Sequence, residues 1–201
     1  MPLPAPDARE LLHARDIALR GYRRADGQLD IEAHLTDVKT ASPWNDSGRR
    51  EKPAGEPIHD MWIRMTVDES LHITACVAVS DHTPYAICPG AAPNFARLAG
   101  LRIGPGFNRA VVERVGGTLG CTHLREVLGQ MATVAYQTIY PLRARKEAGE
   151  NDRHMQPGAP VPRRLPPMVG SCIAYAPDSP VTLERWPWVK DVLAEKAQAA
   201  D

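Results

Sequence analysis

The sequence predicts an α+β fold, with a small three-stranded antiparallel sheet packed by helices. Segments with the two-residue periodicity of β-strands lie in the first half of the chain, and helical spacing of apolar residues follows Pro89. No internal repeat is detectable. Because the strands precede the helices instead of alternating with them, the pattern is typical of α+β domains.

Three runs of alternating apolar and polar residues are the expected strands, and they span residues 28–40, 59–68 and 71–80. A short polar link joins the last two runs as a hairpin. In the second run the alternation puts His59 on the apolar face and Asp60 on the opposite face. The apolar faces consist of Leu29, Ile31, Ala33 and Leu35 in the first run, Met61, Ile63, Met65 and Val67 in the second, and Leu71, Ile73, Ala75, Val77 and Val79 in the third.

A long helix is predicted to begin near Thr122. We expect Thr122 to be its N-cap, and Glu126 lies favourably in the first turn. Apolar residues that recur at intervals of three and four would pack one helix face on the sheet. They are Leu124, Val127, Leu128, Met131, Val134, Ala135, Thr138, Ile139 and Leu142. The helix is expected to fade in the charged run 143–152.

The prolines divide the chain into two parts. Residues 1–150 are the expected α+β core domain, and residues 151–201 are a proline-rich C-terminal arm with a terminal helix from about Thr182. Trp186 and Trp188 are expected to dock this arm onto the core or onto a second subunit. A homodimer is therefore one possible assembly.

Charge and hydropathy exclude several classes of partner. The chain carries 24 lysines and arginines against 24 aspartates and glutamates, so it lacks the basic excess of a nucleic-acid binder. No apolar run approaches the roughly 20 residues that a membrane-spanning helix needs. The N-terminal segment has acids and prolines where a signal peptide has lysines and an apolar core, so we expect a cytoplasmic protein.

The four cysteines do not indicate a disulfide framework, because the chain is long enough to build its own core. Cys76 and Cys172 are expected to be structural. Cys121 is expected at the N-terminus of the long helix, where amide groups and the helix dipole favour a thiolate.

Reactive side chains gather at three junctions between the expected elements, at residues 58–60, 87–89 and 120–123. Side chains at such junctions lie at the ends of strands and helices, where functional sites are usually assembled. His123 follows Cys121 so closely that the two can converge only if Cys121 lies in the loop before the helix. His34 lies among polar residues on one strand face.

The motifs of these segments resemble a bacterial family of domains of unknown function. The resemblance covers roughly residues 15–145 and rests on Gly21-Tyr22-Arg23-Arg24, Glu32-Ala33-His34-Leu35-Thr36-Asp37, Ile58-His59-Asp60-Met61 and Gly120-Cys121-Thr122-His123-Leu124. The order of elements is also similar, more distantly, to the U-type iron–sulfur scaffold proteins. That likeness would place His59 or Asp60, Cys88 and Cys121 at the positions of the scaffold's three cysteines, although the first cysteine is missing here.

The resemblance implies a metal site, and the ligand chemistry agrees with it. Two thiolates and an imidazole suit a tetrahedral zinc ion, with iron as the alternative cofactor. We expect His59, Cys88 and Cys121 to bind the metal and to leave one position for water or a small-molecule substrate. The expected catalytic residues are His123, Asp60 and Glu126, and His34 is expected to contact the substrate or the outer shell of the site.

Three functions follow from these residues. The first is a cytoplasmic zinc-binding protein, favoured as a metal-dependent hydrolase or lyase that acts on a small organic metabolite. The second is a metal or sulfur carrier or scaffold in iron–sulfur assembly. The third is a metal-free enzyme in which Cys121 is the nucleophile and His59 or His123 is the base.

Overall fold

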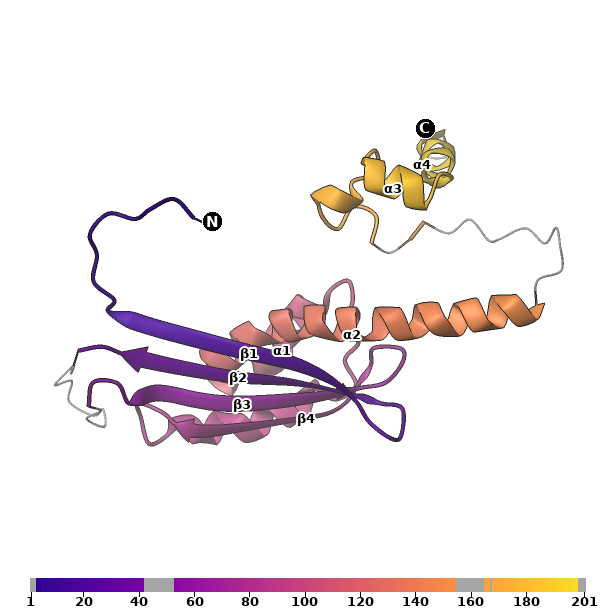
Figure 1. Ribbon diagram of the computed structural model, residues 1–201. Coiled ribbons are helices and arrows are strands. Elements are labelled where there is room, and N and C mark those ends of the chain that lie inside the picture. Colours follow the sequence, from indigo (N-terminus) through magenta and orange to yellow (C-terminus); the bar gives the residue numbers. More distant parts are fainter. Residues whose placement is uncertain (1–2, 42–52, 155–164, 167, 199–201) are drawn as a thin grey trace. The chain divides into compact units, whose positions relative to one another are not determined.

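The computed structural model describes residues 3–41, 53–154, 165–166 and 168–198. The chain divides into two compact units, Met1–Gly149 and Glu150–Asp201. The first unit is an α+β structure with an antiparallel sheet (Figure 1), which confirms the predicted class. Its strands are β1 (His13–Arg23), β2 (Leu29–Lys39), β3 (Pro57–Val67) and β4 (Ile73–His82).

The sheet has four strands in the order β1-β2-β3-β4, so the prediction of three was wrong. The missed strand is β1, which pairs with β2 along its whole length. Most of its residues are exposed because it is an edge strand. Its alternation of apolar and polar residues is correspondingly weak, and the sequence signal was too small to recognise.

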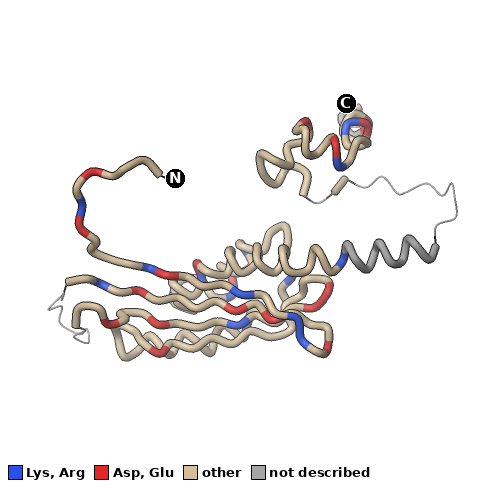
Figure 2. Tube along the Cα trace, viewed as in Figure 1, with Lys and Arg blue, Asp and Glu red and all other residues tan. Residues whose placement is uncertain are grey.

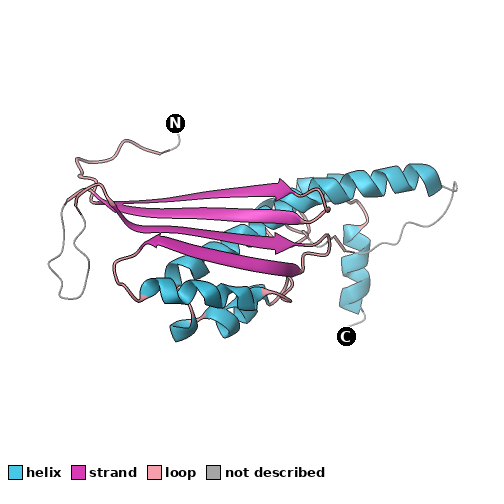
Figure 3. Ribbon diagram, turned by 90° about the horizontal axis from the view of Figure 1, so that it is seen from below, coloured by secondary structure: helices cyan, strands magenta, loops and turns pink. Residues whose placement is uncertain are grey.

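The helices that begin in the first unit are η1 (Cys88–Leu98) and η2 (Gly117–Leu119), both of the 3₁₀ type, and the α-helices α1 (Phe107–Val115) and α2 (Thr122–His154), of which α2 ends beyond Gly149. They cover one face of the sheet (Figure 3). The predicted apolar faces of β2 and β3 form the core with the stripe of α2, and Ile31, Met65 and Met131 are fully buried in it. The helix continues to His154, so the prediction that it fades in the run 143–152 was wrong.

The predicted facing of β4 is reversed beyond Thr74. Val67 pairs with Ile73, but Thr66 pairs with Ala75, so Thr74 is an extra residue that bulges out of the ladder. One extra residue moves the side chains that follow it, as far as the next register shift after Ser80, to the opposite face. Cys76 is therefore buried, whereas Val77 and Val79 are 61% and 47% exposed.

The second unit contains the short helices η3 (Ile173–Tyr175), α3 (Pro180–Arg185) and α4 (Val189–Gln198). The hydroxyl of Ser179 caps α3 by accepting a hydrogen bond from the Thr182 amide at 3.1 Å. The helix thus begins before Thr182, because proline fits the first helical position. Most of the predicted proline-rich arm lies outside the described residues, and the docking of Trp186 and Trp188 onto the core or a second subunit stays a prediction.

Two further features of the described residues concern charge and hydropathy. Acidic and basic residues are interspersed along the strands of the first unit (Figure 2). Among the helices of the described chain, none combines the length and apolar character needed to cross a membrane.

Candidate functional site

The candidate site begins with three residues in one row across the sheet. Arg15 on β1, Asp37 on β2 and His59 on β3 are partners in register. Asp37 follows Leu35 on the core face of its strand, and His59 precedes Met61 on the same face of the next. Asp37 and His59 therefore lie at the end of the sheet where its apolar core face stops. The register of β2 with β3 shifts immediately beyond Asp37. Such β-bulges are frequent next to functional sites.

Asp37 is a buried carboxylate, only 1% exposed, that accepts four hydrogen bonds. Oδ1 accepts from Arg15 Nε at 2.7 Å and lies 2.9 Å from His13 Nε2. Oδ2 accepts from Arg15 Nη2 at 2.8 Å and lies 2.9 Å from His59 Nδ1. Burial by itself would raise the pKa of Asp37, but the bonds from Arg15 and His13 and the charges of Arg15 and His59 lower that pKa to about 2.

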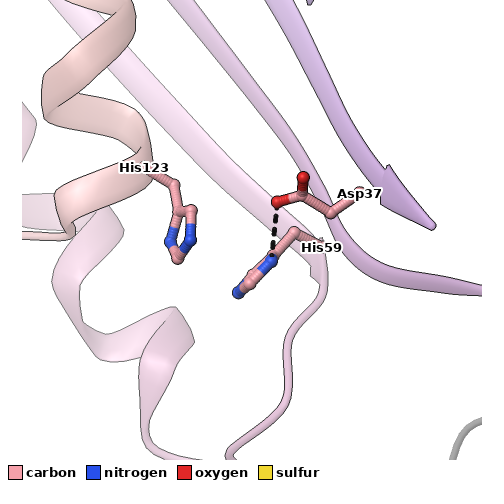
Figure 4. Close-up of side chains that lie close together, drawn as sticks. All are labelled: Asp37, His59 and His123. Atoms are coloured by element: carbon pink, nitrogen blue, oxygen red, sulfur yellow. Dashed lines mark hydrogen bonds and ion pairs between the residues drawn. The ribbon is translucent and has the colours of Figure 1, made fainter. Parts of the chain in front are cut away.

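His123 approaches His59 from the first turn of α2. The two ring centroids are 3.9 Å apart and the rings are tilted by 37° (Figure 4). Burial lowers the pKa of both histidines; the neighbouring His123 lowers that of His59 further, and the charge of Arg15 lowers that of His123. These shifts favour the neutral form of both imidazoles, which is the form that binds metal ions.

Asp37, His59 and His123 form a group that could hold a metal ion. One potential ligand atom from each lies within 4.8 Å of those of the other two. The three come from β2, β3 and α2, so the packing of the helix on the sheet creates the group. Imidazole nitrogens and a carboxylate oxygen are ligands that suit zinc and other divalent transition metals.

Neither predicted cysteine ligand belongs to this group. Cys121 lies in the loop immediately before α2, as the convergence with His123 required, and its Sγ is 3.8 Å from His123 Nδ1. Cys88 is the first residue of η1 and is partly exposed. Metal binding by these two cysteines stays a prediction.

Asp60 and His34 lie on the opposite face of the sheet from His59, as the alternation of β2 and β3 requires. His34 Nε2 is 2.7 Å from Asp60 Oδ1, and the His34 ring stacks on Trp62 with centroids 3.6 Å apart. The sheet therefore separates this pair from His123. Their predicted catalytic and substrate-contact roles stay predictions, but the structure does not bring them to the group of Asp37, His59 and His123.

Glu126 lies beside the group, one turn after His123 on α2. Its carboxylate accepts a hydrogen bond from Arg15 Nη1 at 3.3 Å, and its side chain is about half exposed. Arg15 thus links Glu126 to Asp37. The role of Glu126 in proton transfer stays a prediction.

Sequence reasoning missed Asp37, Arg15 and His13. Asp37 had a readable signal, since it stands two residues beyond Leu35 in the apolar register of β2. A charged residue in a core register needs a buried partner. The partners themselves lie on β1, the strand that the sequence did not reveal.

The site and fold together define a class: an α+β protein with a histidine–carboxylate group where the core meets the end of the sheet. The chain belongs to the family described as "Protein of unknown function (DUF2889)", whose model matches residues 13–137. This confirms the predicted membership in a domain family of unknown function. The matched range includes the whole sheet and every residue of the group. No curated protein and no solved structure matches the chain.

Proposed function

We propose that this protein binds one divalent metal ion, zinc in the first place, through His59 and His123. The observation that carries the proposal is the contact between these two rings, whose centroids are 3.9 Å apart and which are both partly buried. Two imidazoles that are kept neutral and face one another from a strand and a helix are suited to share an ion. Iron is the alternative metal.

Cys121 is the nearest candidate for a further ligand. Its Sγ lies 3.8 Å from His123 Nδ1, immediately before the first residue of α2. A small rotation of either side chain would be needed for both to bind one ion. Cys88 shows no comparable contact with His59 or His123 in the described part of the chain, so we place it behind Cys121.

A site of this kind leaves coordination positions for water and substrate. A zinc ion held there would lower the pKa of a bound water to about 7 and would so supply a nucleophile or a base at neutral pH. We propose a hydrolase or lyase acting on a small organic metabolite. Glu126 would accept a proton, since it lies one turn from His123 and half its surface is open to solvent.

Metal-free catalysis by Cys121 is the second candidate. The approach of His123 Nδ1 to the Cys121 sulfur supports it, because a histidine can remove the thiol proton. A carrier or scaffold role in iron–sulfur assembly rests on the resemblance of the sequence alone, and we rank it third.

The test is the metal content of full-length protein purified without an affinity-metal step. We expect about one zinc per chain in the wild type, and its loss in His59→Ala and His123→Ala. His34→Ala is the matched control, because His34 also pairs with an aspartate but lies on the other face of the sheet. It should retain the metal.

Two results would contradict the metal proposal. One is a wild-type protein without metal that also fails to bind added zinc. The other is equal loss of metal in His34→Ala and His59→Ala. If the metal-free wild type instead loses activity or ligand binding on alkylation of Cys121, the nucleophile proposal replaces it. The variant Cys121→Ser separates the two, since it abolishes nucleophilic catalysis but removes at most one of several ligands.

A further inference from the structure

We infer that Asp37 is a positioning residue outside the coordination sphere, which fixes the tautomer of His59 and presents its Nε2 atom to the metal. The inference rests on the proposed metal function and specifies it, because Asp37 could otherwise be counted as a ligand. The inference assigns direct coordination of the metal to His59 Nε2 and to His123.

The first argument is that the oxygens of Asp37 are already used. Arg15 donates to both of them at 2.7 and 2.8 Å, and His13 and His59 each lie 2.9 Å from one. An ionised carboxylate has about four lone-pair sites, so these four contacts, made by three residues, fill them. A metal ion bound to Asp37 would have to displace a donor.

The second argument concerns charge. A divalent cation on Asp37 would lie beside the guanidinium group of Arg15, which is held to the same two oxygens. The positive charges of the cation and of Arg15 would repel one another strongly, because they would be neighbours in a partly buried site. Asp37 is also only 1% exposed, so water cannot screen the repulsion well. The ion is better placed on the far side of the His59 ring.

The third argument fixes the proton of His59. Guanidinium nitrogens only donate, so both oxygens of Asp37 act as acceptors. The His59 Nδ1 atom, 2.9 Å from Oδ2, must then carry the hydrogen. In the neutral ring the lone pair is left on Nε2, which lies on the side of His59 away from Asp37 (Figure 4). A carboxylate that orients a metal-binding histidine in this way is a common arrangement around metal ions.

The chain contains its own control for this argument. His34 pairs with Asp60 through Nε2 at 2.7 Å, whereas His59 pairs with Asp37 through Nδ1. A carboxylate only accepts hydrogen bonds, so the Asp60 contact assigns His34 the tautomer opposite to that of His59. His34 carries its hydrogen on Nε2 and His59 carries it on Nδ1.

The test is a long-range proton–nitrogen NMR correlation spectrum of nitrogen-15-labelled, metal-stripped full-length protein at pH 7.5. His34→Gln and His59→Gln identify the two sets of signals. We expect His59 in the Nδ1–H form and His34 in the Nε2–H form. An Nε2–H or doubly protonated His59 would overturn the inference. This measurement needs no metal and no variant of Asp37.

Zinc titration of the same sample supplies the second half of the test. We expect a large shift of the His59 Nε2 signal while the Nδ1 hydrogen persists. A shift of the nitrogen signal at Nδ1 with loss of its hydrogen would overturn the inference. If zinc shifts no histidine signal, the proposed metal function fails, whereas the tautomer result still decides the role of Asp37 toward His59.

A variant separates positioning from ligation. Asp37→Asn should weaken zinc binding on the order of 10- to 100-fold and keep the stoichiometry, as outer-shell substitutions do. The cobalt(II) derivative should keep its visible absorption bands, since the inner ligands are unchanged. Complete loss of binding, equal to that of His59→Ala, would show that Asp37 is a ligand. Asp60→Asn is the matched control and should bind zinc like the wild type.

Discussion

Asp37 and His59 face each other across neighbouring antiparallel strands, with Asp37 Oδ2 and His59 Nδ1 2.9 Å apart. Each occupies the position on its strand where the buried apolar face ends. The pair is thus held by the core on one side and lies beside His123 on the other. The same residues should therefore contribute both to the stability of the fold and to the proposed metal site.

Removing the charge of Asp37 should lower the free energy of unfolding. Asp37→Asn leaves Arg15 without its buried partner, and breaking such a pair typically lowers the free energy of unfolding by about 3 kcal/mol. Urea unfolding measures the change. Glu113→Gln is the control, because Glu113 forms an exposed pair with Arg109 at 3.0 Å and should cost less than about 1 kcal/mol. Equal small losses would contradict a stabilising role for the Asp37 pair.

The ionisation of Asp37 should make stability fall in acid. Its pKa of about 2 lies below the unfolded value of about 3.9, so the folded state favours the ionised form. The resulting stabilisation, about 2 kcal/mol, is present above pH 4 and is lost as the pH falls through about 2. Unfolding free energies of the wild type and Asp37→Asn at pH 5, 4, 3 and 2 check this. The difference between the two proteins should shrink over that range; a constant difference would refute the prediction.

Zinc binding should persist to lower pH than ordinary histidines allow. Protons compete with zinc for imidazole nitrogens, and burial lowers the pKa of His59 and His123 below 6.5. The affinity should therefore begin to fall only below pH 6.5. Competition with a chromophoric chelator from pH 8 to pH 5 measures it. A decline that is already centred at pH 6.5 or above would be inconsistent with the lowered values.

The bulge at Thr74 predicts which residues of β4 tolerate charge. Val77→Glu should change the free energy of unfolding by less than about 1 kcal/mol, because Val77 is 61% exposed and pairs in register with Arg64. Cys76→Glu should cost about 3 kcal/mol or more, since it would bury an unpaired charge. Chemical denaturation measures both. If Val77→Glu were the more destabilising of the two, the side chains of β4 would alternate without interruption and the bulge at Thr74 would be ruled out.

The same burial should protect the thiol of Cys76. It is 4% exposed, and burial raises its pKa to about 12, so little thiolate is present at pH 8. Iodoacetamide should label the exposed Cys172 in the native protein and Cys76 only after denaturation. Peptide mass spectrometry locates the label. Labelling of native Cys76 at the rate of Cys172 would contradict its burial.

The sequence by itself determined the faces of β2 and β3, the start of α2 and the junctions that carry His59 and Cys121. These are local properties. Successive side chains of a strand point to opposite faces, and a helix repeats its apolar positions every three or four residues, so a short segment suffices to read them. For the same reason the alternation placed His59 and Asp60 on opposite faces, as the structure has them.

Only the tertiary structure decided that β1 joins the sheet, that Thr74 bulges and that Asp37 meets both His59 and Arg15. An edge strand takes its pairing from its neighbour, and a bulge depends on how two strands fit together. Asp37 and His59 are 22 residues apart in sequence, and His123 comes from a helix packed over both strands. Long-range register and packing bring such groups together, and no local periodicity records which distant residues become neighbours.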